Sequence, residues 1–107
     1  MELKQYFVAL VNLDPTIGSE IKKTRPCLII SPNEMNSNLQ TIIIAPITST
    51  SKMYPTRVEI IGNKTQGWVM LDQIRTIDKS RIVRVFNQIS EEEILRIKQT
   101  LKEFLVN

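Results

Sequence analysis

The chain has no histidine and a single cysteine among its 107 residues. The lack of histidine removes the commonest general base and the commonest metal ligand of proteins. One cysteine cannot form an internal disulfide and does not supply the ligand pattern of a zinc site. We therefore expect no metal and no cofactor, so that any catalysis must use carboxylates, arginine, lysine, hydroxyl groups or the backbone.

Glycine is also scarce, with three residues in the chain. No glycine-rich loop precedes a helix, which excludes a phosphate cradle of the P-loop or dinucleotide-binding type. No apolar run is long enough to cross a bilayer, and the N-terminus lacks the basic-then-apolar pattern of a signal peptide. The sequence predicts a cytoplasmic protein with no membrane partner.

Length and composition predict a single domain that spans residues 1–107. The chain is 42% hydrophobic and 23% charged, and a domain of this length buries roughly two-thirds of its unfolded surface. The formal charge of +3 only weakly favours a polyanionic partner. The distribution is more informative, because Lys22, Lys23 and Arg25 stand together while three acids, Glu91–Glu93, gather at one predicted helix start.

Short apolar and β-branched runs predict strands over the first two-thirds of the chain. They cover residues 6–11, 27–30, 41–45, 57–60, 67–71 and 82–86. A helix is predicted at 91–105, where Ser90 and Glu93 form a capping box ahead of a one-sided apolar stripe. Several short strands and one terminal helix indicate a mainly β fold, a small curved antiparallel sheet or barrel with the helix packed on its open side.

Three segments, in this order and at this spacing, resemble the MazF/PemK (Kid-like) family of toxin endoribonucleases. They are Gly18-Ser19-Glu20 with residues 24–32, then residues 45–50, then residues 71–78. The resemblance extends over roughly residues 4–105. It implies an SH3-like small β-barrel of the kind shared by CcdB and MazF, paired as a homodimer. It also implies an antitoxin partner whose acidic and apolar C-terminal segment lies across the dimer groove.

The resemblance implies that Arg25 and Thr48 are catalytic. Arg25 precedes Pro26, which holds it in an extended conformation, and a guanidinium forks onto phosphate oxygens. Taken alone, Arg25 would be a surface residue at a strand start. Thr48 opens a run of hydroxyl residues, 48–51, which taken alone would be a solvated loop with local hydrogen bonds. The resemblance makes Thr48 a donor to the scissile phosphate.

Other residues carry weaker expectations. Glu20 is expected to assist catalysis, the alternative being an exposed ion pair with Lys22 or Lys23. The expected substrate contacts are Ser19, Lys22, Ser49, Thr50, Lys52 and Gln73. Asp72 is expected to be structural and Cys27 to be a buried, inert thiol. Trp68 lies in an apolar strand, so core packing is favoured over dimer packing or stacking on a base.

The implied reaction is metal-independent, sequence-selective cleavage of single-stranded mRNA. The ribose 2′-hydroxyl attacks the neighbouring phosphorus and leaves a 2′,3′-cyclic phosphate or 3′-phosphate and a 5′-hydroxyl end. Two alternatives stay open. One is a non-catalytic small-barrel module that binds RNA or protein. The other is a gyrase-poisoning CcdB-like toxin, which acts through a tryptophan near its C-terminus, whereas this chain ends Phe104-Leu105-Val106-Asn107.

Overall fold

A computed structural model describes residues 2–13, 24–50, 53–61 and 66–106. The strands are β1 (Phe7–Asn12), β2 (Thr24–Ile29), β3 (Thr41–Thr48), β4 (Arg57–Ile60), β5 (Gly67–Met70), β6 (Arg75–Asp78) and β7 (Ile82–Gln88). The helices are α1 (Asn33–Asn38), the 3-10 turns η1 (Leu71–Gln73) and η2 (Lys79–Arg81), and α2 (Glu91–Leu101), which widens into a π-helical end, η3 (Lys102–Val106). No helix in these described ranges is long and apolar enough to span a membrane.

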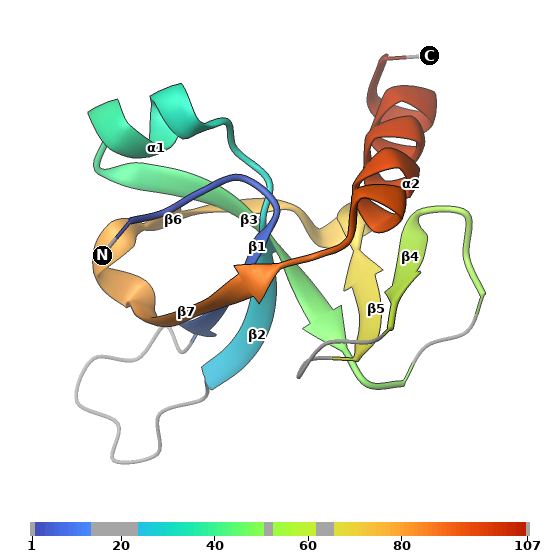
Figure 1. The fold of residues 1–107 in the computed structure, drawn as a ribbon, viewed down its shortest axis with the longest axis horizontal. Coiled ribbons are helices and arrows are strands. Elements are labelled where there is room, and N and C mark those ends of the chain that lie inside the picture. Colours follow the sequence, from blue (N-terminus) through green and yellow to red (C-terminus); the bar gives the residue numbers. More distant parts are fainter. Residues whose placement is uncertain (1, 14–23, 51–52, 62–65, 107) are drawn as a thin grey trace.

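Strand β3 is the centre of the sheet. Neighbouring strands are antiparallel, in the order β4-β5-β3-β2-β1-β7, while β6 pairs with the first half of β3. One edge of β3 therefore carries β2, and the other carries β6 and then β5. The result is an open, barrel-like sheet with α2 against one side and α1 at the far end (Figure 1). The predicted mainly β architecture is confirmed.

The two faces of the sheet bury separate apolar clusters. One cluster includes Val8, Leu28, Ile47 and Val69, and the fully buried Ile97 brings α2 onto it. The other includes Cys27 from β2 together with residues of β1, β3, β6 and the start of β7. Because strand side chains alternate between faces, each central strand contributes to both clusters.

The capping box predicted at the start of α2 is confirmed, and it also ties the helix to the sheet. Ser90 Oγ accepts from the Glu93 backbone N–H at 3.1 Å, and Glu93 Oε1 accepts from the Ser90 N–H at 3.0 Å. Glu93 Oε2 accepts from the Ile61 N–H, just past β4, at 2.7 Å. The buried carboxylate thus satisfies two backbone donors that belong to different elements.

The C-terminal end of the predicted helix is less regular and more exposed than its apolar sequence pattern suggests. The regular helix ends at Leu101, and η3 continues to Val106. Phe104 is 39% exposed and Leu105 is 62% exposed, although both follow the apolar stripe of the sequence. Leu101 is the last helical residue that packs against the core cluster, so the final turn has no sheet beneath it.

Two elements, α1 and β6, have no counterpart in the predicted strands and helix. Helix α1 is short and polar, and buried Ser31 and Asn36 anchor it. Asn36 Nδ2 donates to the Ser31 carbonyl at 2.9 Å, and Ser31 Oγ accepts from the Ile43 N–H at 3.0 Å. Strand β6 pairs with β3 directly after η1.

Glu93→Gln tests the link between α2 and β4. An amide has a single acceptor oxygen, so one of the two backbone N–H groups loses its partner and faces an NH₂ group. We expect the free energy of unfolding to fall by about 1–3 kcal/mol, measured by urea denaturation. Glu92→Gln, at an exposed position of the same turn, is the matched control, with an expected change within about 0.5 kcal/mol. Equal losses in both variants would contradict the role of Glu93.

Candidate functional site

The structure brings Arg25 and Thr48 together at one end of the sheet. In the register of β2 and β3, Cys27 lies opposite Pro46, and continuing it by two residues sets Arg25 opposite Thr48. Facing side chains in antiparallel strands have Cβ atoms about 4.5–5.5 Å apart. Both residues line one cavity of about 240 Å³, whose other lining residues are Thr24, Pro26, Ile47, Ser49 and Gln66.

Arg25 projects from a rigid part of the sheet. It pairs with Val11 of β1 on one side and faces Thr48 on the other, and Pro26 follows it directly. Val11 is fully buried, whereas Arg25 is exposed. The guanidinium therefore stands in solvent on a fixed backbone, an arrangement suited to binding a phosphate group.

The Thr48 hydroxyl takes part in a local turn. It donates to the Thr50 carbonyl at 3.0 Å and accepts from the Thr50 N–H at 3.4 Å. This is the local bonding expected of a hydroxyl-rich loop, yet the residue also lines the cavity with Arg25. To donate to a phosphate, the O–H must rotate away from the Thr50 carbonyl, while its oxygen keeps the bond from the Thr50 N–H.

Cys27 is a buried thiol, as predicted. Burial raises the pKa of Cys27 to about 12, although the positive charges of Arg25 and Arg75 act to lower it. The thiol is therefore protonated at neutral pH. Arg75 of β6 is a second guanidinium, close enough to Cys27 to act on the pKa of its thiol. Arg75 is exposed and lies opposite Ile44 of β3. Nothing in the sequence pattern singled out Arg75.

The remaining predicted contacts divide into three groups. Ser49 lines the cavity, and Thr50 is bonded to Thr48 beside it. Gln73 is exposed at the end of η1 and is not among the residues that line this cavity. Four predicted residues lie outside the described ranges: Ser19, Glu20, Lys22 and Lys52.

Asp72 has the structural role that the sequence predicted. It accepts from Thr56 Oγ1 at 3.1 Å and from Arg57 Nε and Nη2 at 3.3 and 3.4 Å. Burial acts to raise the pKa of Asp72, but the bonds from Arg57, from its own backbone and from Thr56 prevail and hold the pKa below its usual value. This ion pair joins η1 to the start of β4.

Trp68 does not have the core position favoured for it. It is half-buried and belongs to neither apolar cluster. Its side chain lines two cavities, of about 430 and 460 Å³. The prediction is wrong because Trp68 lies on the face of β5 opposite to Val69, which packs in the core cluster, and keeps part of its surface exposed.

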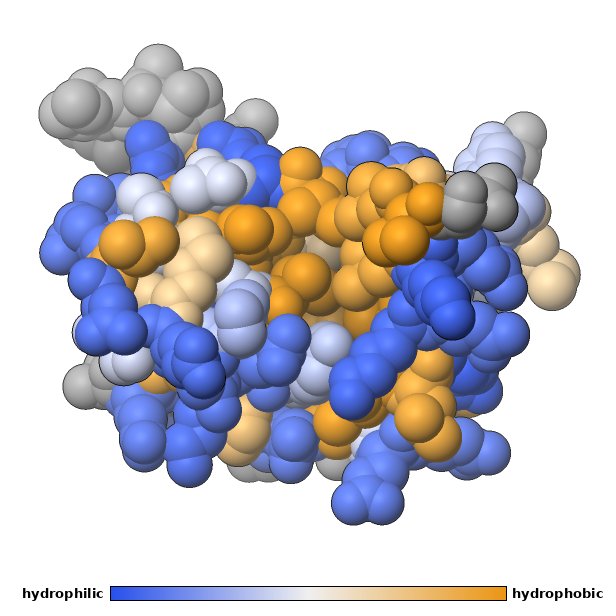
Figure 2. Space-filling model, turned by 90° about the horizontal axis from the view of Figure 1, so that it is seen from above, coloured by the Kyte–Doolittle hydropathy of each residue, from blue (hydrophilic) through white to orange (hydrophobic). Residues whose placement is uncertain are grey.

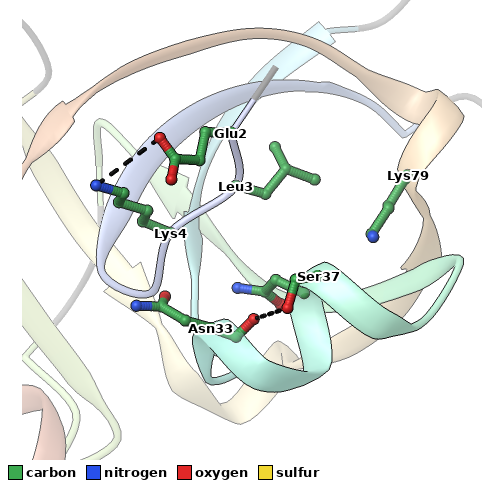
Figure 3. Close-up of a pocket in the computed structure, with 7 residues that line it drawn as sticks. Glu2, Leu3, Lys4, Asn33, Ser37 and Lys79 are labelled. Atoms are coloured by element: carbon green, nitrogen blue, oxygen red, sulfur yellow. Dashed lines mark hydrogen bonds and ion pairs between the residues drawn. The ribbon is translucent and has the colours of Figure 1, made fainter.

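A further hollow of about 420 Å³ lies between the N-terminal segment, α1 and η2 (Figure 3). Several of its polar groups already have partners within the protein. Glu2 pairs with Lys4 at 3.8 Å, and Ser37 donates to the Asn33 carbonyl at 2.9 Å. Within the described ranges, no three His, Cys, Asp or Glu side chains gather in a group that could hold a metal ion. The Arg25–Thr48 cavity therefore remains the strongest candidate site.

Comparison with known proteins gives one consistent family. Residues 4–105 match the profile of the family described as the PemK-like, MazF-like toxin of type II toxin-antitoxin systems. The chain is 34% identical to endoribonuclease PemK of Escherichia coli, over 86% of this chain and 77% of PemK. It is 32% identical to endoribonuclease EndoA of Bacillus subtilis, over 95% and 93% of the two chains.

The fold also matches solved structures. A MazE–MazF crystal structure from Deinococcus radiodurans superposes with a TM-score of 0.84 at 24% identity, covering 98% of this chain and 96% of the other. A mycobacterial endoribonuclease in complex with its cognate antitoxin gives a TM-score of 0.82 at 22% identity, covering 96% and 94%. At these identities the likeness establishes the fold.

The Cys27 thiol should be unreactive in the folded protein. With its pKa raised to about 12, we expect no alkylation by iodoacetamide at pH 8 and full alkylation in urea. The same shift makes the contribution of this group to stability complete below about pH 8.5, the unfolded value, and progressively lost as the pH rises toward 12. Alkylation without unfolding would contradict the burial of this residue.

Gly67→Ala tests the close contact between β5 and β3. A Cβ on Gly67 would lie 2.4 Å from the Thr48 carbonyl oxygen, so the strands must separate where Thr48 is held. The glycine also has φ +157°, which residues with a side chain rarely adopt. We expect a loss of at least about 1 kcal/mol in unfolding free energy, whereas Gln66→Ala, next in the chain and exposed, should change it by less than about 0.5 kcal/mol. Unchanged stability in Gly67→Ala would contradict the contact.

Proposed function

The chain belongs to the PemK-like, MazF-like toxin family of type II toxin–antitoxin systems, and we propose that it cuts single-stranded mRNA without a metal ion. It is an endoribonuclease toxin, as the curated relatives are. The observation that carries the mechanism is the placement of Arg25 and Thr48 in one cavity. In the pentacoordinate transition state of phosphate cleavage, negative charge builds up on the phosphorane oxygens. A fixed cation beside a hydroxyl group can stabilise that charge.

The proposed reaction is an internal displacement at phosphorus. The ribose 2′-oxygen bonds to phosphorus as its proton passes to a base, and the bond to the 5′-oxygen breaks as that oxygen takes up a proton. Arg25 stabilises the charge on the phosphorane oxygens and donates the proton to the leaving oxygen, because a guanidinium is a poor general base. Thr48 donates a hydrogen bond to a non-bridging oxygen, and Glu20 assists the proton transfer.

Single-stranded RNA suits this site better than a duplex. A paired A-form helix hides its base edges and restrains the geometry for in-line attack, whereas an unpaired strand can splay its bases. We assign contacts along the strand to Ser49, Thr50 and Gln73, and to Ser19, Lys22 and Lys52. Because the basic side chains of this site bind phosphates, the affinity for RNA should fall as the salt concentration rises.

We also propose that the chain acts as a homodimer. Figure 2 shows an apolar hollow between the end that carries α1 and the end that carries α2. Partly exposed residues that pack against the core include Ile30, Ile74 and Leu101, and Leu105 and Val106 are exposed at the end of α2. A second copy covering this apolar surface would remove it from water.

The proposed regulator is a cognate antitoxin. Structural neighbours include MazE–MazF and an endoribonuclease with its antitoxin. A disordered segment with acidic and apolar residues would screen the Arg25 and Arg75 charges and occupy the substrate groove. We place the action of the toxin itself in the cytoplasm, where the proposed mRNA substrate is found.

The two alternatives fare differently. Membership in the family and the place of Trp68 in a strand, far from the C-terminus, argue against gyrase poisoning of the CcdB kind. A non-catalytic module for RNA or protein would use the same exposed Arg25 and hydroxyl loop, so it is separated from the toxin by activity alone.

Arg25→Ala should abolish cleavage while the fold stays intact. We expect wild-type protein in EDTA to cut a long single-stranded RNA at discrete sites with 5′-hydroxyl ends, and the variant to cut at least about 100-fold more slowly. Thr48→Val, which keeps the shape and removes the hydroxyl, should also be slowed. The readout is end-mapping of the products.

Arg84→Ala is the matched control, because Arg84 is also an exposed strand arginine but lies in β7, outside the cavity. Its cleavage should match that of wild-type protein. Cleavage that requires a divalent ion would overturn the proposed mechanism, and an RNA left intact by folded wild-type protein would favour the binding module.

A further inference from the structure

We propose that Trp68 is a stacking platform for a nucleobase beside the scissile phosphate, an inference that rests on the proposed function. Nothing in the family resemblance pointed to this residue, and the sequence favoured a core position for it. Its actual place, half-buried and lining cavities next to the Arg25–Thr48 site, is what calls for an explanation.

The strand registers set Trp68 in a row with the candidate catalytic residues. Trp68 lies opposite Thr48 of β3 on one side and opposite Glu59 of β4 on the other. Residues directly opposite one another share a face of the sheet. With Arg25 opposite Thr48, the row runs across four strands as Arg25, Thr48, Trp68 and Glu59, at about 4.8 Å per strand.

The other face of these strands is the core, so the row points to the substrate side. Ile47, Val69 and Val58 form the neighbouring row and are all buried in one apolar cluster. Side chains alternate along a strand, which turns Thr48 and Trp68 away from that cluster. The indole is thus held by a packed backbone with part of its surface left free.

The cavity over Trp68 adjoins the cavity at Arg25. Ser49 and Gln66 line both, and the cavity at Trp68 has a volume of about 430 Å³. A nucleotide whose phosphate lies between Arg25 and Thr48 would have a neighbouring base one strand further along, over the indole. An aromatic face next to a cationic phosphate site is the usual construction of single-strand binding grooves.

Glu59 offers a hydrogen-bond acceptor to a base at this position. Its exposed carboxylate lies directly beside Trp68, and no ion pair joins it to another residue in the part of the chain that the structure describes. A carboxylate accepts hydrogen bonds from the amino groups of bases. The row therefore holds the sugar–phosphate chain at Arg25 and a base at Trp68.

The chain offers a direct test, because Trp68 is its only tryptophan. An oligodeoxynucleotide of mixed sequence lacks the attacking 2′-hydroxyl, so it binds without being cut. We expect it to quench the tryptophan fluorescence of wild-type protein saturably. A matched strand with abasic sites keeps the phosphates and should bind without this quenching. Binding of the base-containing strand, seen by anisotropy of a labelled strand, with no change in tryptophan fluorescence would overturn the proposal.

Substitutions separate stacking from packing. Trp68→Leu keeps an apolar side chain without a ring, and we expect it to weaken affinity by about five- to a hundredfold, raising KM more than it lowers kcat. Trp68→Phe should keep much of the affinity. Urea denaturation of both variants checks that the fold is retained. Wild-type affinity in folded Trp68→Leu would overturn the proposal and favour a protein partner at this surface.

The outcomes also distinguish this inference from the proposed function. Quenching by the strand without any RNA cleavage would leave Trp68 a stacking platform in a non-catalytic module. Cleavage that depends on Arg25, with no quenching and no effect of Trp68→Leu, would keep the endoribonuclease and remove the platform.

Discussion

The pairing of β3 on both of its edges is the constraint on which the rest of the structure depends. β2 occupies one edge, and β6 and β5 divide the other between them. Because a shift of one residue turns every side chain to the opposite face, these registers decide which residues meet. The backbone of Gly67 comes so close to the Thr48 carbonyl that a side chain there would disturb the pairing that aligns Thr48 with Trp68.

The candidate site lies at the border of a buried part of β2, so a cationic surface stands directly against a core. Cys27 is fully buried and Arg25, two residues earlier on the same face of β2, is exposed. The barrel-like sheet therefore opens between these two residues. Cys27 lies at this border. Burial raises the pKa of its thiol, while the positive charges of Arg25 and Arg75 act to lower it.

The elements that could be predicted from the sequence are those marked by an apolar or capping pattern within a few neighbouring residues. The apolar strand runs and the capping box of α2 could be seen in this way, whereas α1 and β6 could not, because polar residues or a short edge pairing define them. Register is not readable from one sequence, so the row that contains Trp68 and Glu59 was missed. The meeting of Arg25 and Thr48 came from family resemblance, since their separation of 23 positions along the chain predicts no contact.

At the end of the sheet that carries the candidate site, β3, β4 and β5 bury one face in the core and hold Thr48, Trp68 and Glu59 on the other. Glu93 and Ile97 fasten α2 to one side, and the row from Arg25 to Glu59 lies on the other. The two faces share the backbone of β3, β4 and β5. Polar groups on the exposed face add little to folding, because solvent already satisfies them, so this face can carry charges and a partly bare indole without loss of the fold. A packed face that fixes the backbone is what allows the opposite face to be chosen for chemistry.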